Sequence, residues 1–182
     1  MAFNVNSFSG ALKEGGARNA LFEVTITNPI DGAADVQVPF MVKSAQIPAS
    51  TLGTIEVPYF GRQIKLAGNR TYAEWTPTII NDEDFAIRNN LEKWSNAINS
   101  AQGNLRTAGG SAPSLYSSNA QVTQFSKTGE VLRTYNFVGL YPSEVSTIDL
   151  SWETEGIEEY TVTFQYDYWE VVGGSTGDAG GI

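Results

Sequence analysis

Alternation of apolar and polar residues near the end of the chain constrains its fold more than any other sequence feature. Apolar side chains occupy every second position of segment 160–168: Tyr160, Val162, Phe164, Tyr166 and Tyr168, against Thr161, Thr163, Gln165 and Asp167. A repeat of two residues places the two sets on opposite faces of a β-strand. The segment therefore predicts a half-buried strand, and such a strand must belong to a sheet that covers a core.

Shorter segments with a similar period predict further strands. These are 22–26, 36–42 with Pro39 interrupting it, 120–125 and 131–138 joined by a turn at 127–130, and 148–152. Between them, 44–54 is an irregular excursion, 55–57 and 62–66 lead into a tight turn at Gly68-Asn69, and 73–80 is the return strand. Gly and Asn tolerate positive φ, which suits a hairpin turn.

One helix is predicted at about 83–100. Ile87, Leu91, Trp94 and Ile98 follow one another at spacings of four, three and four, which gives a single apolar stripe. Asn81 or Asp82 is suited to the N-cap, and acidic residues follow in the first turn. The fold class is then mainly β: an antiparallel sandwich or barrel-like sheet with one packed α-helix.

The predicted organisation is one β-domain at 20–170 between two end segments. Residues 1–19 are an N-terminal arm, 102–119 a Gly-containing surface loop, and 171–182 a flexible C-terminal tail. The N-terminus lacks the pattern of a secretory signal, and no stretch approaches the ~20 apolar residues of a membrane helix. We therefore expect synthesis in the cytoplasm and no membrane anchoring.

The residue inventory argues against catalysis. The chain has no Cys and no His, which removes disulfides, thiolate nucleophiles, Cys/His zinc sites and histidine bases. The acids at 81–84 lack the spacing of a calcium loop and are better explained by helix capping. Four glutamates at 153–159 could supply a carboxylate pair for glycoside hydrolysis, but acids are common in turns. We expect no catalytic, cofactor or metal site.

Charge is distributed unevenly along the chain. The net charge is −9, and the 49 residues after Arg133 hold nine acids and no Lys or Arg. Such a chain has no basic cluster with which to grip nucleic-acid phosphates. Charged residues make up only 17% of the chain, below the roughly 25% usual for soluble domains. Either other subunits cover part of the surface, or the surface is neutral and rich in Ser, Thr and Asn.

An ordered set of residues runs through the predicted hairpin and into the helix: Gly61, Arg62, Ile64, Ala67, Gly68, Arg70, Thr71, Tyr72, Trp75, Thr76, Asn81, Asp82 and Glu83. This block resembles the tail tube proteins of contractile-tailed bacteriophages of the T4 type. Segments beginning at Asn19, Ala45, Gly139, Ile148 and Tyr166 extend the resemblance over roughly 19–170. The two ends and the 102–119 region depart from the family pattern.

The resemblance implies a structural subunit of the virion, assembled in the host cytoplasm. In that family, hexameric rings stack into a tube inside a contractile sheath, and DNA passes through the lumen. Implied partners are further copies of the chain, the tail sheath protein, and baseplate and tail terminator proteins. Tape-measure protein and DNA would occupy the lumen without specific binding. Residues expected to become buried only in the tube, as subunit or ring contacts, are Ile47, Pro48, Leu52, Tyr59 and Phe60.

Two other functions compete with this interpretation. The nearer one is the inner tube of a contractile injection particle or a type VI secretion system, which shares the architecture but moves protein. The more distant one is a monomeric carbohydrate-binding β-sandwich that uses Trp75 or Trp169 as a sugar platform.

For a tube, the acidic C-terminal part of the chain also predicts a net acidic lumen, which would keep DNA from adhering.

Overall fold

The computed structural model describes residues 4–12, 16–153 and 155–177. Its elements, in chain order, are α1 (Val5–Ala11), β1 (Phe22–Ile26), η2 (Gly32–Ala34), α2 (Val38–Met41), β2 (Val42–Ser44), β3 (Ser50–Tyr59), β4 (Arg62–Tyr72), β5 (Thr78–Ile80), α3 (Ala86–Ile98), η3 (Ala108–Gly110), α4 (Pro113–Tyr116), β6 (Ser118–Phe125), β7 (Val131–Val145), β8 (Glu159–Gln165) and β9 (Tyr168–Val171).

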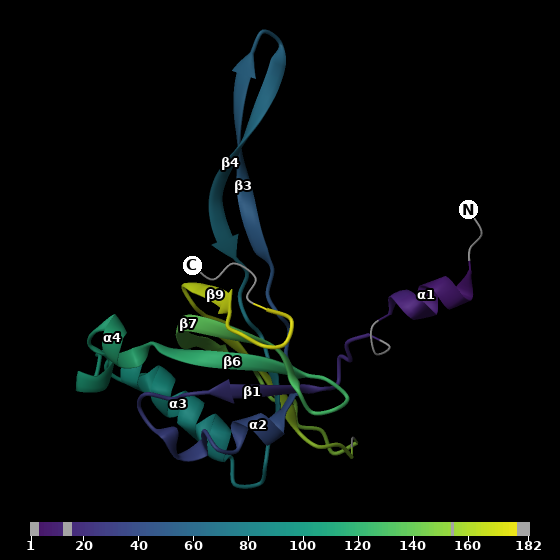
Figure 1. Ribbon diagram of the computed structural model, residues 1–182. Coiled ribbons are helices and arrows are strands. Elements are labelled where there is room, and N and C mark those ends of the chain that lie inside the picture. Colours follow the sequence, from purple (N-terminus) through teal and green to yellow (C-terminus); the bar gives the residue numbers. More distant parts are fainter. Residues whose placement is uncertain (1–3, 13–15, 154, 178–182) are drawn as a thin grey trace.

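The strands form two separate sheets. Seven of them make a curled antiparallel sheet with the order β1-β6-β7-β8-β5-β2, in which β9 also pairs with β7. The other two, β3 and β4, form a long hairpin that projects from the body (Figure 1). The mainly β class with a packed helix is confirmed, and the first predicted strand coincides with β1.

The core lies between α3 and the seven-stranded sheet. Ile87, Leu91 and Trp94 of α3 are buried, as the apolar stripe predicts. Trp75 is fully buried and stacks on Phe137 with the ring centroids 4.7 Å apart. Buried aromatic rings of this size dominate core energetics, so the Trp75–Phe137 pair should contribute much of the stability of the body.

The predicted strand 160–168 is divided into β8 and β9. The break falls at Asp167, whose backbone N–H donates to the Val138 carbonyl at 2.9 Å. Gly139 lies at this crossing with φ +74°, and a Cβ there would stand 2.4 Å from Asp167 Oδ2. β7 therefore pairs with β9 over 135–138 and with β8 over 141–145. One bend at Gly139 turns the sheet from β9 to β8.

The prediction of a strand over 36–42 is wrong. Residues Val38–Met41 form the short helix α2, and only Val42 begins a strand. Pro39 explains the difference, because its fixed φ and missing N–H suit the first turn of a helix. Val38 is buried against the core, while Val36 is exposed. The apolar residues of this segment therefore predict neither its backbone conformation nor, as a group, its burial, since Phe40 is exposed as well.

The predicted N-cap at Asn81 or Asp82 is also wrong. α3 begins at Ala86 after Phe85, which has φ +52°. Asp84 Oδ1 accepts the Ala86 N–H at 3.0 Å, and Asn81 instead donates through its side chain to Glu158 at 2.8 Å. The acids shape a turn before the helix. No group of three or more acidic residues suited to holding a metal ion occurs in the described part of the chain.

One further prediction fails. Residues 148–152 form no strand, because β7 ends at Val145 and β8 begins only at Glu159. Residues 102–119, predicted as a surface loop, are mostly exposed and contain η3, α4 and the start of β6. The Trp94 indole N–H donates to the Tyr116 carbonyl at 2.7 Å, which holds α4 on α3.

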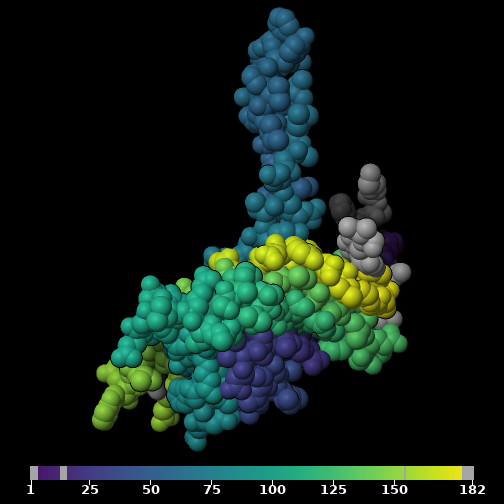
Figure 2. Space-filling model, turned by 90° about the vertical axis from the view of Figure 1, so that its left-hand side faces the viewer, coloured from purple at the N-terminus to yellow at the C-terminus, as the bar shows by residue number. Residues whose placement is uncertain are grey.

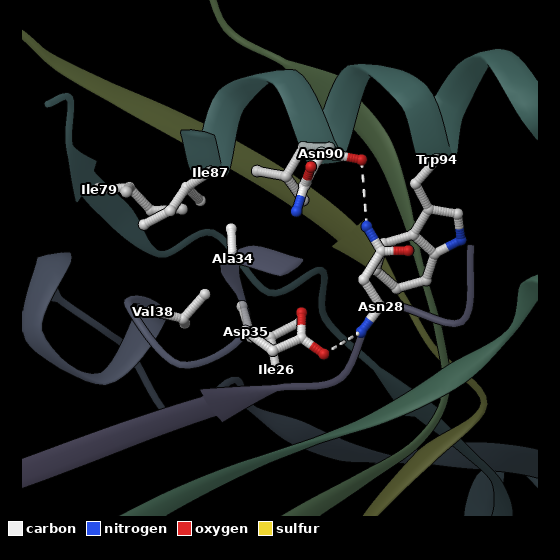
Figure 3. Close-up of a pocket in the computed structure, with 10 residues that line it drawn as sticks. Ile26, Asn28, Ala34, Asp35, Val38, Ile79, Ile87, Asn90 and Trp94 are labelled. Carbon is white, nitrogen blue, oxygen red and sulfur yellow. Dashed lines mark hydrogen bonds between the residues drawn. The ribbon is translucent and has the colours of Figure 1, made fainter. Parts of the chain in front are cut away.

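A buried polar cluster joins segment 28–35 to α3 (Figure 3). Asn28 donates from Nδ2 to the Asn90 carbonyl at 3.1 Å, and its backbone N–H donates to Asp35 Oδ2 at 3.0 Å. Asn90 in turn donates to the Asp31 carbonyl at 3.1 Å. These side chains border a cavity of about 20 Å³ that is otherwise lined mainly by apolar residues. Satisfied polar groups fix the loop geometry there.

The end segments differ in how they contact the body. α1 has no buried residue, and its Val5, Phe8 and Leu12 side chains are exposed. At the other end, Ser175 and Thr176 donate backbone hydrogen bonds to carbonyls at the start of β7. The rest of the predicted tail, 178–182, lies outside the described residues. None of the helices described is both long and apolar enough to span a membrane.

Candidate subunit interface

The β3–β4 hairpin is the candidate interface, because apolar side chains remain exposed along it. Its turn lies at Phe60-Gly61, where both residues have positive φ, 45° and 75°. Two consecutive positive φ values are the requirement of a two-residue hairpin turn that matches strand twist. The predicted turn at Gly68-Asn69 is therefore wrong, and so is the return strand 73–80, of which only Thr78–Ile80 is a strand.

Gly68 and Asn69 lie inside β4 at a bulge. The register runs from Leu52 opposite Arg70 to Thr54 opposite Ala67, so two residues of β4 face Gly53 alone. A Cβ on Gly68 would stand 3.2 Å from the Gly53 carbonyl oxygen. The glycines allow this close approach, and a bulge raises the local twist of a hairpin. The glycine and asparagine that suggested a turn therefore form a bulge, which twists the hairpin.

The register above the bulge gives the hairpin an apolar face. Ile55 pairs with Leu66 and Val57 with Ile64, while Tyr59 pairs with Arg62 beside the turn. Directly opposed residues of an antiparallel pair share a face. All five apolar members are exposed, as is Phe60 at the tip, with 90% of its surface open to solvent. Figures 1 and 2 show the hairpin standing clear of the body.

The opposite face of the hairpin is polar. Glu56 pairs with Lys65 at 3.9 Å, and Pro58 lies opposite Gln63. Within residues 50–72 the charged residues are Arg62, Lys65 and Arg70 against Glu56, so the hairpin carries +2 in a chain of net charge −9. The hairpin is thus amphipathic and differs in sign from the rest of the molecule.

Two aromatic donors hold the root of the hairpin. Trp169 Nε1 donates to the Pro48 carbonyl at 3.1 Å, just before β3. The Tyr166 hydroxyl donates to the Ala73 carbonyl at 2.5 Å, just after β4. The rings of both residues contact Tyr72 edge-on at centroid distances of 6.1 and 6.2 Å. The two ends of the hairpin are therefore fixed to the same part of the main sheet, which sets the direction in which it projects.

The hydrogen bonds at the root of the hairpin, which we call the clamp, do not depend on pH in the physiological range. Burial, with a smaller contribution from the neighbouring Tyr72, raises the pKa of Tyr166 to about 12. The phenol therefore stays protonated across physiological pH, and its hydroxyl keeps donating to Ala73. A hydrogen bond of this kind contributes on the order of 1 kcal/mol.

The five predicted contact residues differ in how exposed they are in the single chain. Tyr59 and Phe60 are exposed at the hairpin tip and Leu52 is exposed nearer its root. Ile47 is half-buried and packs against the core. Pro48 is already buried in the single chain, so the expectation that it becomes buried only in a tube is wrong. Its carbonyl accepts the indole N–H of Trp169.

The two tryptophans of the carbohydrate-binding alternative are likewise accounted for by internal contacts. Trp75 is fully buried and cannot offer a face to a sugar. Trp169 is half-buried, with its indole N–H donated to Pro48 and its ring edge-on to Tyr72 and Tyr135. Neither ring forms an open stacking platform.

Sequence reasoning missed the apolar face of the hairpin. Its further members are Ile55, Val57, Ile64 and Leu66. Their i, i+2 spacing on either side of Phe60-Gly61 is visible in the sequence. Placing the turn at that dipeptide would have brought all four to one face. The root residues Tyr166 and Trp169 carried no comparable signal, because each donates to a carbonyl that is distant in sequence.

Comparison with known proteins gives consistent matches. The family model described as phage tail tube protein matches residues 6–172. The tail tube protein gp19 of Enterobacteria phage T4 is 33% identical over 156 residues, covering 85% of this chain and 91% of that protein. The tail tube protein of Serratia phage KSP90 is 27% identical, covering 86% and 89%.

Solved structures share the fold at lower identity. A chain of the anti-feeding prophage tube-terminating cap superimposes with a TM-score of 0.65 at 17% identity, covering 86% of this chain and 91% of that one. A chain of the sheath-tube complex of an extracellular contractile injection system gives 0.64 at 15% identity, covering 94% and 99%. These likenesses concern the fold.

Proposed function

The chain belongs to the phage tail tube protein family, and on that premise we propose that it assembles into stacked hexameric rings inside a contractile sheath. The stacked rings form the conduit through which DNA enters the host. Its role is mechanical, and it needs no catalytic group. The observation that carries the proposal is the projecting hairpin with one unpartnered apolar face.

That apolar face supports assembly on physical grounds. Ile55, Val57 and Tyr59 lie beside Ile64 and Leu66 on a two-stranded ribbon. An isolated hairpin of two strands is marginal in water, and contiguous exposed apolar surface marks interaction sites. The free edges of β3 and β4 would also invite unwanted pairing unless another subunit covered them. A neighbouring copy that covers the hairpin resolves both problems.

The remaining partners follow from the tail architecture. A relative in fold comes from a sheath-tube complex and others from a baseplate and a sheath/tube terminator, which supports sheath, baseplate and terminator proteins as neighbours of this chain. DNA and a tape-measure protein would occupy the lumen without specific binding. The acidic segment after Arg133 supports a net acidic lumen that repels DNA. A tube structure with a lysine-lined lumen would exclude this.

The competing function is the tube of an injection particle that moves protein. The two architectures are similar in fold, so the fold does not separate them. Sequence favours the phage, because the relatives at 33% identity are tail tube proteins of phages T4 and T6. Genes for a capsid and a terminase beside the gene for this chain would support the phage function, and effector genes would support the other.

Negative-stain electron microscopy of the purified protein tests the proposal. The wild-type chain should form tubes, whereas Phe60→Asp should remain folded and fail to form them, because a charge at the hairpin tip cannot be buried without a partner. Leu105→Asp is a matched control, since Leu105 is also exposed but lies away from the hairpin. Normal tubes from Phe60→Asp would contradict the role of the hairpin, and a monomeric wild type under all conditions would contradict the function.

A further inference from the structure

The connection between β7 and β8 is a second exposed apolar surface. Leu150, Trp152 and Ile157 have 84%, 107% and 74% of their surface open to solvent. The described residues of this connection, 146–153 and 155–158, belong to no helix or strand, although 148–152 has the alternation of a half-buried strand. Long connections without secondary structure are uncommon in compact domains and are usually either functional or linker segments. Three large apolar side chains in one such connection are costly to expose unless another molecule covers them.

This connection is hydrogen-bonded to the turn before α3. Asn81 donates to Glu158 through both its backbone N–H and its side chain, each at 2.8 Å. We name residues 81–85, 147–153 and 155–158 together the receiving surface. Its acids are Asp82, Glu83, Asp84, Asp149, Glu153, Glu155 and Glu158, and none of these stretches contains Lys or Arg.

The hairpin and the receiving surface lie at opposite ends of the molecule. Figure 1 shows the hairpin projecting at the top and the β5–α3 connection at the bottom. Figure 2, turned by 90°, again shows the yellow-green β7–β8 connection at the lower end. Each surface therefore has to find its partner on another copy. Contacts between opposite ends of identical subunits generate an open filament.

We propose that the receiving surface is the docking site for the hairpin tip of the next copy along the tube. The inference rests on the proposed function and names the part of the neighbour that the hairpin meets. Tyr59 and Phe60 would pack against Leu150 and Trp152. The +2 charge of the hairpin faces a surface with seven acids and no base, so attraction fixes the orientation of the contact. The ten residues of β3 span roughly 33 Å, so the hairpin tip lies far from the body of its own subunit.

Trp152 is expected to be the main anchor, because large aromatic residues that become buried at an interface carry much of its binding energy. Trp152→Ala should raise the protein concentration needed for tube formation at least tenfold. Its melting temperature should equal that of the wild type, because the side chain is fully exposed in the single chain. Tube formation at the wild-type concentration would overturn the proposal.

Charge exchange tests the pairing itself. Arg62→Glu/Lys65→Glu changes the hairpin from +2 to −2 opposite seven acids and should abolish tubes. Glu83→Lys/Asp149→Lys/Glu153→Lys/Glu155→Lys changes the receiving surface from −7 to +1; on its own it should abolish tubes, and combined with the hairpin variant it should restore them. Arg18→Glu/Arg106→Glu changes the net charge as much as the hairpin variant at exposed sites outside both surfaces, and should assemble normally. Failure of the combined variant to restore tubes overturns the proposal.

The experiment separates this inference from the function on which it rests. If the wild-type chain forms no tubes, the proposed function falls. If the wild type and all receiving-surface variants form tubes equally well, only the docking site falls. If those variants form tubes but no longer bind the sheath protein, the receiving surface is a sheath contact. If the receiving surface instead holds two copies of the chain in a closed dimer in solution, it is a two-fold contact. Protection of amides 148–152 from hydrogen exchange, in tubes and not in dissociated protein, is the expected positive result.

Discussion

The hairpin and the body of this molecule use similar side chains in opposite ways. In the body, Ile79 of β5 and Trp75 are completely buried between the sheet and α3. In the hairpin, Ile64 pairs with Val57 in an equally regular ladder, yet both remain about half exposed. Strand pairing alone therefore does not bury a side chain. A strand needs a second layer, which the body has in α3 and the hairpin lacks.

This difference separates two kinds of stability. The body can be stable as a single chain, since its apolar surface is covered by its own residues. The hairpin depends on its root, where Tyr166 and Trp169 hold the carbonyls of Ala73 and Pro48, and on whatever covers its apolar face. Substitutions in the body should change the stability of the monomer, and those in the hairpin should change assembly.

A matched pair of substitutions gives the largest expected contrast. Ile79→Ala removes a fully buried side chain and should cost about 2–5 kcal/mol of unfolding free energy, which lowers the melting temperature by roughly 10 °C. Ile64→Ala removes the same atoms from an exposed site and should cost about 0.5 kcal/mol or less. Denaturant unfolding of the dissociated protein measures both. Equal losses would show that the hairpin is packed within the monomer after all.

Tyr166→Phe should have an intermediate effect. It deletes the hydroxyl that donates to Ala73 and keeps the ring that contacts Tyr72 and Phe137. The expected loss is about 1 kcal/mol, with faster hydrogen exchange at the root of β3 and β4. Tyr72→Phe is the control, since no hydrogen bond of its hydroxyl contributes to the clamp described above. An unchanged exchange rate at the root would mean that Trp169 alone holds the hairpin.

The sequence predicts the body better than the hairpin. Period-two segments and the helical stripe placed β1, most of β6 and β7, and the buried face of α3, because burial and period coincide there. Pro39 and Asp167 were misjudged. The conformation at Pro39 follows from its position in a helical first turn, and the kink at Asp167 follows from contact with Gly139, 28 residues away. Local patterns carry neither kind of information.

The sequence predicts only part of the exposed apolar surface that we propose as an interface. A glycine at a bulge and a glycine at a turn look alike in the sequence. The turn was therefore predicted at Gly68-Asn69, whereas it lies at Phe60-Gly61. The error displaced the register and concealed the apolar face. Leu150 and Trp152 presented the reverse problem, since their alternation predicts a half-buried strand but they lie exposed and in no strand of the single chain. A pattern can predict burial without specifying which molecule provides it.

The smallest effect should come from Asp35, at the edge of the buried polar cluster. Burial raises the pKa of Asp35, and although the Asn28 N–H bond lowers it, the net shift is upward. A carboxyl whose pKa is raised in the folded state favours folding when protonated, so its contribution is fully present below the ordinary pKa and is lost as pH rises through the folded pKa. At pH 7 the ionised group is therefore mildly unfavourable.

Asp35→Asn removes that charge while its side-chain oxygen can still accept the Asn28 N–H. The variant should be more stable than the wild type at pH 7 by about 0.5 kcal/mol or less. The difference should shrink toward zero as pH falls to the ordinary range of an aspartate, near 3.9. Urea unfolding of both proteins at several pH values measures it. A variant that is less stable at pH 7 would show that the charged hydrogen bond outweighs burial, and the polar cluster would then depend on ionised Asp35.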